Sequence, residues 1–346
     1  MTFVPAGLGE PTTTTIGRRR GSVRRTSDIR MLRADGADGA EAATGSSGLE
    51  LVGRARDLRT DTSGAATVLD EASVRAVLVG DRRLGELRTE PDEPAARALL
   101  GERVAGGFRA ALDRALPTHR AARSPLYLLL DDLPVAALIS GYGDLYRREL
   151  PPPVPPTAPG GPQGAGGERP ASMLKADICS GWRSDGTMMV ALRERGQIPI
   201  TVGPAAPSLE DPADPLGWHE IAALPPGAMR RRRLVDVTAG DPLVVHAMFR
   251  DTHADAGGTE TVLHEYSLDL EVDPATFVVL HSRATPHVLP WTECPAAAAS
   301  ARRLEGQVAG DLRQFVRSEL TGTSTCTHLN DLLRSVADVP ALVASL

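Results

Sequence analysis

Strict alternation of apolar and polar residues predicts a β-strand in the stretch TETVLHEYSLDLEVDP, residues 259–274. One side of this strand is apolar and the other is mainly acidic. The apolar side consists of Val262, His264, Tyr266, Leu268, Leu270 and Val272. Since His264 and Tyr266 share that side, we expect both side chains to point into the protein core.

A spacing of four between apolar residues predicts two amphipathic helices, at 90–112 and 294–316. The two segments are related by a shift of 204 positions, which takes Glu90 to Cys294. The shift superimposes the apolar residues Leu100, Val104, Phe108 and Leu112 on Leu304, Val308, Leu312 and Val316. Both helices therefore have the same apolar face.

Three further blocks recur in the same order along the chain. RRTSDI at Arg24 resembles RRLVDV at Arg232, ARDL at Ala55 resembles FRDT at Phe249, and LLDDL at Leu129 resembles HLNDL at His328. We interpret this order as an internal duplication, with chance similarity between alanine- and arginine-rich helices as the alternative. In the first copy, Glu90, Tyr127 and Leu129 stand opposite Cys294, Cys326 and His328, so only the second copy has reactive side chains here.

These patterns divide the chain into five parts: a disordered arm at 1–20, a degenerate first repeat at 21–150, a Pro/Gly linker at 151–170, an insertion at 171–229 and a second repeat at 230–346. Within the insertion, SGWRSDGTMMVAL predicts a strand, a turn at Asp185–Gly186 and a second strand. We therefore expect an α+β fold. Two related β-plus-helices repeats would pack about a pseudo-twofold axis, with an inserted β-hairpin and loop.

Composition restricts the partners and the compartment. A net charge of −6 and an aromatic content of 3% argue against a nucleic-acid-binding surface. No run approaches the roughly 18 apolar residues that indicate a membrane helix, so we expect no membrane partner. Three cysteines are too few for a disulfide framework, and the start of the chain lacks a signal pattern. We expect a cytoplasmic protein.

The stretch TSTCTHLNDLL, residues 323–333, contains the main candidate site. Cys326 lies at the predicted start of a helix, where the helix dipole stabilises a thiolate and lowers the pKa of the thiol. With His328, His264 and Cys294 it would form a Cys2His2 set suited to zinc. The four residues come from three separate segments, so metal-free Cys/His catalysis and a purely structural role remain as alternatives.

Three other groups of residues have weaker chemical signals. His253 and Glu260 fall in a predicted solvated hairpin loop. The run of four arginines at 230–233 fits a solvated strand edge, and the pair Asp131–Asp132 fits a helix end.

The second repeat resembles a bacterial family, domain-of-unknown-function family 2889. The resemblance rests on His264 in an alternating strand, Cys294-Pro295, and the block Cys326-Thr327-His328-Leu329 with Asp331-Leu332-Leu333. Thr325 departs from the family pattern, where a glycine is expected before the cysteine. Shorter members look like a single copy of this unit, which agrees with a duplication. The resemblance implies no activity.

The leading hypothesis for function is a cytoplasmic enzyme, such as a hydrolase or lyase, acting on a small, largely apolar organic acid or thioester. Cys326, His328 and His264 would be the catalytic residues, and these three with Cys294 the metal ligands, with zinc as the favoured ion. The alternative is a non-catalytic accessory or ligand-binding protein with buried structural cysteines. The duplication favours a monomer that acts as a pseudo-dimer, with a homo-oligomer as the alternative.

Overall fold

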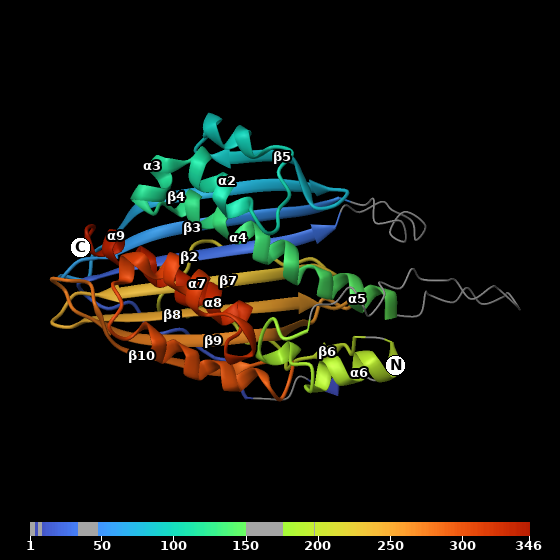
Figure 1. The fold of residues 1–346 in the computed structure, drawn as a ribbon. Coiled ribbons are helices and arrows are strands. Elements are labelled where there is room, and N and C mark those ends of the chain that lie inside the picture. Colours follow the sequence, from blue (N-terminus) through green and yellow to red (C-terminus); the bar gives the residue numbers. More distant parts are fainter. Residues whose placement is uncertain (1–3, 6–8, 34–47, 150–175, 197) are drawn as a thin grey trace, which may run out of the picture.

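A single antiparallel sheet of eight strands forms the framework of the protein in the computed structural model, which describes residues 4–5, 9–33, 48–149, 176–196 and 198–346. The strand order is β10-β9-β8-β7-β2-β3-β4-β5, so each half of the chain contributes four neighbouring strands (Figure 1). The halves join where β2 pairs with β7 along ten residue pairs, from Ser22–Thr238 to Met31–Met229. The α+β class and the two similar halves predicted from the sequence are confirmed.

The first half contains β2 (Ser22–Arg33), β3 (Leu49–Thr60), β4 (Ala66–Val79) and β5 (Arg83–Glu90). The second half contains β7 (Met229–Thr238), β8 (Leu243–Ala254), β9 (Glu260–Val272) and β10 (Val279–Val288). The β3–β4 and β8–β9 pairs each have a register shift at the same place, after Asp57 opposite Asp70 and after Asp251 opposite His264. A shared irregularity of this kind supports the duplication, because bulges are specific features of a sheet.

Helices cover one face of the sheet (Figure 1). The helices of the first half are η1 (Pro94–Leu99), α2 (Phe108–Ala115), α3 (Pro117–Ala122), α4 (Pro125–Ile139) and α5 (Gly141–Glu149). Those of the second half are η4 (Cys294–Leu304), η5 (Ala309–Asp311), α7 (Leu312–Glu319), η6 (Gly322–Ser324), α8 (Thr327–Ser335), η7 (Val336–Asp338) and α9 (Val339–Val343). The stretch Pro125–Arg147 is long and apolar enough to cross a membrane, but 78% of its apolar window is buried inside the protein. It is the central helical segment of the first-half core.

The predicted long amphipathic helix is interrupted in both halves by a glycine with left-handed backbone. Gly101 and Gly306 have φ of 81° and 80°, a conformation that favours glycine. Each donates its N–H to the edge strand, at Leu84 O and Val279 O. Pairing Gly101 with Gly306 moves the alignment of the two halves by one residue from the predicted alignment in this region. Accordingly Leu99, rather than the 44% exposed Leu100, is the buried counterpart of Leu304.

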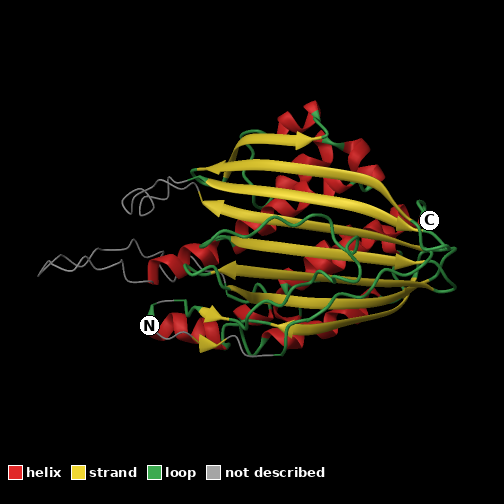
Figure 2. Cartoon of the chain, turned by 180° about the vertical axis from the view of Figure 1, so that it is seen from behind, coloured by secondary structure: helices red, strands yellow, loops and turns green. Residues whose placement is uncertain are grey.

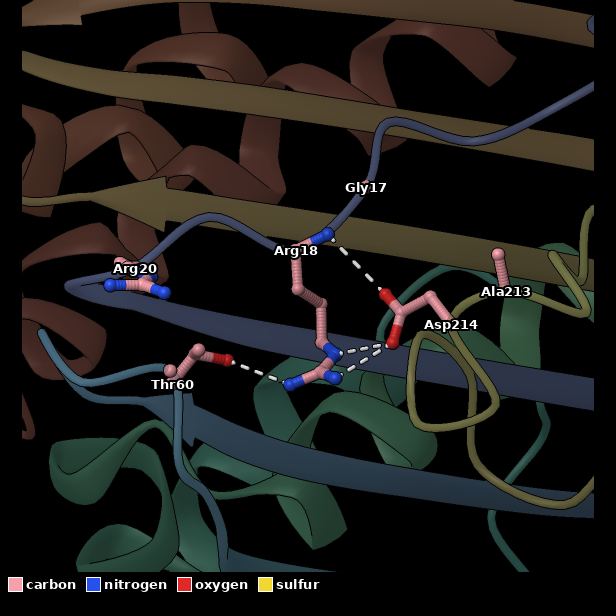
Figure 3. A pocket seen from close by; sticks show the side chains of 7 residues that line it. Gly17, Arg18, Arg20, Thr60, Ala213 and Asp214 are labelled. Atoms are coloured by element: carbon pink, nitrogen blue, oxygen red, sulfur yellow. Dashed lines mark hydrogen bonds and ion pairs between the residues drawn. The ribbon is translucent and has the colours of Figure 1, made fainter.

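The other face of the sheet is covered by irregular segments, 9–21 and 198–228 (Figure 2). Arginines on the sheet hold them: Arg24 donates to Ile16 O, and Arg250 donates to the carbonyl oxygens of Thr12 and Pro207. Arg18 forms an ion pair with Asp214 at 2.7 Å and bonds to Thr60 (Figure 3). Residues 9–20 are therefore packed on the sheet, which corrects the expectation of a disordered arm for them.

The insertion is helical where a β-hairpin was predicted. Residues 180–182 form the short helix η3 (Ser180–Trp182), and α6 (Thr187–Arg195) follows Gly186. Most residues of MMVALRER are good helix formers, and Gly196 closes α6 in the left-handed conformation. A short strand β6 (Thr201–Val202) pairs in parallel with β1 (Val4–Pro5). The predicted linker at 151–170 lies outside the described residues.

The arginines at 230–233 lie in β7 at the centre of the sheet, so the prediction of a solvated edge is wrong. Arg231 and Arg233 face the helices, where Arg231 pairs with Asp251 at 2.9 Å and Arg233 with Asp132 at 3.0 Å. Duplication explains the position, because the first strand of each half becomes a central strand. Buried charges of this kind are tolerated when each has a partner.

Asp131 and Asp132 are buried in the interior of α4, not at a helix end as predicted. Asp131 accepts from Arg313 at 2.6 Å and from Arg334 at 3.1 Å, both from the second half. In the reciprocal direction, Arg109 of the first half donates to Asp331 of the second at 2.9 Å. These exchanged ion pairs fasten the helical layers of the two halves to each other.

Candidate metal site

Asp251, His264 and His328 come together in the second half, between the sheet and α8. Asp251 on β8 and His264 on β9 are directly opposite each other in the ladder. The register shift beside this pair leaves Leu263 unpaired and turns Val262 to the other face of the sheet, where it packs with Val288. The prediction that Val262 shares a face with His264 is therefore wrong. His328, in the first turn of α8, is brought over the strands because α8 packs on β8 and β9.

The geometry of these three side chains meets the requirement for a metal site. One ligand atom from each residue lies within 4.8 Å of the others, and among the described residues this is the only such group of three or more. The rings of His264 and His328 stack at 3.9 Å with an angle of 18° between them. His264 Nδ1 is 3.3 Å from Asp251 Oδ2, yet this buried atom has no well-aligned hydrogen bond to any described residue. The group could hold a metal ion.

The electrostatics keep Asp251 and His328 in the forms that bind metals. Burial alone would raise the pKa of Asp251, but Arg231 and then His264 outweigh it and hold the pKa below its usual value. Burial, followed by the charge of His264, lowers the pKa of His328 well below its usual value. At neutral pH the site therefore has an ionised carboxylate and a neutral His328 imidazole, as metal ligation requires. His264 is 17% exposed and His328 half-buried, so the site reaches solvent.

Arg231 holds the carboxylate of Asp251 in place by hydrogen bonding to it. Its guanidinium lies 4.6 Å from the centre of the Phe249 ring and 3.6 Å from Asp331 Oδ2, in addition to the contact with Asp251. The guanidinium donates to both oxygens of Asp251, at 2.9 Å to Oδ1 and 3.4 Å to Oδ2, and so fixes the carboxylate with Oδ2 beside His264.

The cysteines of the predicted zinc set lie beside this group rather than within it. Cys326 precedes α8, and its Sγ is 4.0 Å from His328 Nδ1, at the outer limit for a hydrogen bond to sulfur. Cys294 lies in the core, where its carbonyl accepts from Tyr266 at 3.2 Å. A Cβ added at Gly181 would be only 2.6 Å from Cys294 Sγ, which shows how closely the insertion packs on this thiol.

The pKa of the Cys326 thiol is raised in the structure, whereas the position of Cys326 at a helix start predicted a lowered pKa. Burial raises the pKa of its thiol to about 11, and the backbone N–H groups of Leu329 and His328 only partly oppose that shift. Burial also raises the pKa of the thiols of Cys294 and Cys179. All three thiols are thus protonated at neutral pH in this structure.

Asp251 is the member of this group that sequence reasoning missed. The repeated blocks ARDL and FRDT contained the signal, since both place an aspartate at this position of the second strand. What the blocks could not show is that β9 places His264 opposite that aspartate, because the ladder register depends on the turn between the strands.

The first half has an equivalent buried arginine–aspartate pair but lacks the two histidines. Arg25 holds Asp57 at 2.6 Å, as Arg231 holds Asp251. Opposite Asp57, however, stands the exposed Asp70 in place of His264. The first-half helix α4 is lined by buried leucines such as Leu129 where α8 has His328. Only the second half therefore has the donor set.

His253 and Glu260 lie at the ends of strands β8 and β9 rather than in a loop. His253 is buried, with its ring 4.5 Å from that of Tyr146 and 5.4 Å from that of Tyr142. Glu260 accepts from Thr252. Both residues lie outside the group that could hold a metal.

Fold and site together define an α+β protein whose eight-stranded sheet has two similar halves, with one Asp/His/His cluster among the described residues. Residues 229–342, about a third of the chain, form a domain of the family described as protein of unknown function (DUF2889), which confirms the resemblance over these residues. No curated protein and no solved structure matches the chain.

Proposed function

We propose that the protein is a metal-dependent enzyme whose metal ion is bound by Asp251, His264 and His328. The observation that supports this proposal is the convergence of the three donors from β8, β9 and α8 on one point. Two imidazoles and one carboxylate form a three-residue ligand set, which catalytic zinc sites and non-haem iron sites use because it leaves coordination positions open. Structural zinc sites instead use four protein ligands.

Zinc is the favoured ion, and hydrolysis or lyase chemistry on a small, largely apolar organic acid or thioester is the favoured reaction. A bound zinc ion would polarise a carbonyl oxygen and lower the pKa of a coordinated water to about 7. Arg231 would fix Asp251, and the stacking of His264 on His328 would orient both rings. Tyr266, Phe249 and Leu329 supply apolar surroundings on the same elements. A cytoplasmic location and a small-molecule substrate are part of the proposal.

The structure favours the metal over a metal-free cysteine nucleophile. A thiol whose pKa is about 11 is almost entirely protonated at neutral pH, and the thiolate is the reactive form. The raised pKa values of the buried thiols also support a second candidate, a non-catalytic ligand-binding protein with structural cysteines. Metal analysis distinguishes the two.

The test is elemental analysis of the purified full-length protein, followed by substitution with cobalt. We expect about one zinc or iron per chain, lost in His264→Ala and His328→Ala and retained in the control His246→Ala, another histidine of the same sheet. Cobalt bound by Asp, His and His would show no sulfur-to-cobalt charge-transfer band, whereas ligation by Cys326 or Cys294 would produce one. Absence of stoichiometric metal, or its retention in both ligand variants, would overturn the proposal.

A further inference from the structure

A cavity lies on the helical side of the sheet, at the boundary between the two halves. Its volume is about 680 Å³, and its walls come from α2 and α4 of the first half and from α7 and α8 of the second. None of the described residues that line it belongs to the metal site. The size is that of a pocket for a small organic molecule.

The cavity has an excess of positive charge. Seven of the lining side chains are arginines and four are aspartates, so guanidinium groups outnumber carboxylates in the lining. Arg109, Arg313 and Arg334 are engaged with the buried Asp131 and Asp331. Within the part of the chain that the structure describes, Arg123 and Arg317 form no ion pair.

Arg123 is placed in the cavity by an unusual local backbone. It ends α3 with φ of 52°, in the left-handed region that glycine normally occupies. Its Nη2 reaches across the boundary between the halves to Gly310 O at 3.5 Å, while the buried Nη1 has no hydrogen-bond partner among the described residues. Burial, and then the nearby Arg313, lower the pKa of Arg123. A buried N–H without an acceptor is costly, so a shift of the Arg123 guanidinium that brought Nη1 to an anion in the cavity would be favourable.

Apolar side chains complete the cavity. Val135 and Leu138 of α4 line it from the first half, and Val316 and Leu320 line it from the second. Leu138 is 53% exposed, although most residues of α4 are buried. The lining thus combines forked guanidinium donors, which match carboxylate and phosphate groups, with an apolar surface.

We propose that this cavity binds a small organic anion. Its phosphate or carboxylate group is bound by Arg123 and by Arg317 from the other half, and its apolar body packs on Val135 and Leu138. This site is independent of the proposed metal site, since none of its residues is a metal ligand.

Isothermal titration of the full-length protein with phenyl phosphate, benzoate and benzyl alcohol tests the proposal. We expect binding of at least one of the two anions and none of the uncharged alcohol. Whichever anion binds more tightly identifies the headgroup. Arg317→Gln, on an exposed position that the fold does not need, and Arg123→Gln should each weaken binding about 10- to 100-fold, as the loss of a charge-assisted hydrogen bond predicts. Arg193→Gln, an exposed arginine of α6, is the matched control and should leave binding unchanged.

The same titration on His264→Ala separates the cavity from the metal site. Retained binding in that variant supports the cavity and holds even if no metal is found. Binding that disappears in His264→Ala and survives in Arg123→Gln and Arg317→Gln places the anion on the metal and overturns the proposal. Absence of binding for both anions at millimolar concentration also overturns it.

Discussion

The two halves of the sheet share one buried arginine–aspartate pair and differ in what stands next to it. In the first half, Arg25 and Asp57 face an exposed Asp70; in the second, Arg231 and Asp251 face His264 beneath His328. The pair is therefore part of the architecture, and the two imidazoles are additions to it. In the second half, the aspartate of this pair is one of the three residues of the group that could hold a metal ion.

The largest expected effect is on metal content. Converting the second half towards the first with His264→Asp and His328→Leu removes both imidazoles, so bound metal should fall from about one per chain to below about 0.1, a loss in line with the 10- to 100-fold effects of weaker perturbations. Circular dichroism should show an unchanged fold, since Leu is tolerated at buried helix positions such as Leu129. Asp70→His in the first half is the matched control and should gain no metal. Stoichiometric metal in the double variant would refute the comparison.

The next largest effect is the loss of stability when the buried arginine–aspartate pair of either half is broken. Asp251→Asn leaves Arg231, which is 1% exposed, without its closest partner, and should reduce the free energy of unfolding by about 3–5 kcal/mol. Asp57→Asn should cost less, because Arg25 keeps Asp338 at 3.0 Å whereas the other contact of Arg231, to Asp331, is at 3.6 Å. Urea unfolding of both variants measures the difference. A larger loss for Asp57→Asn would contradict this ranking.

The alignment of one half with the other gives a third test. Leu99→Ala and Leu304→Ala should each cost about 2–5 kcal/mol, because both side chains are fully buried. Leu100→Ala should change stability by less than about 0.5 kcal/mol, since the side chain is exposed. A larger cost at position 100 than at position 99 would favour the alignment read from the sequence over the one defined by the glycine hydrogen bonds.

The smallest effect is an acid sensitivity that arises at His253, where the end of β8 packs on Tyr142 and Tyr146 of α5. Burial, and then Arg147, lower the pKa of His253 to about 4, whereas an unfolded histidine titrates near 6.5. The unfolded chain therefore binds a proton first as the pH falls. The neutral histidine's contribution, on the order of 2–3 kcal/mol, is complete above about pH 6.5 and is lost as the pH approaches 4. His253→Phe keeps the packing on Tyr146 and should flatten the stability profile over that range. Parallel profiles for the two proteins would contradict the assignment.

Sequence patterns were sufficient for the class of fold and singled out two of the three residues of the candidate site, His264 and His328. Alternation at 259–274 placed His264 on the helical face, and the repeated blocks indicated two halves. Asp251 was missed because its proximity to His264 depends on ladder register, and Val262 was misplaced because a bulge is not visible in an alternating pattern. The arginines at 230–233 were misjudged for a related reason. Their partners Asp132, Asp251 and Asp331 lie on three other elements, and only the assembled sheet and helices pair them.

The ladder between β2 and β7 has a consequence for the order of events during synthesis. At ordinary rates of translation, the roughly 150 residues that follow β5 before β7 is complete take on the order of ten to thirty seconds to make. Throughout that interval the long edge of β2 is present without its neighbour. An unpaired edge of that length invites aggregation, and charged side chains discourage it. Arg24, Arg25 and Asp28, which are buried in the finished protein, lie along this strand. The residues that later form the central ion pairs can thus keep the nascent first half soluble while it waits for the second.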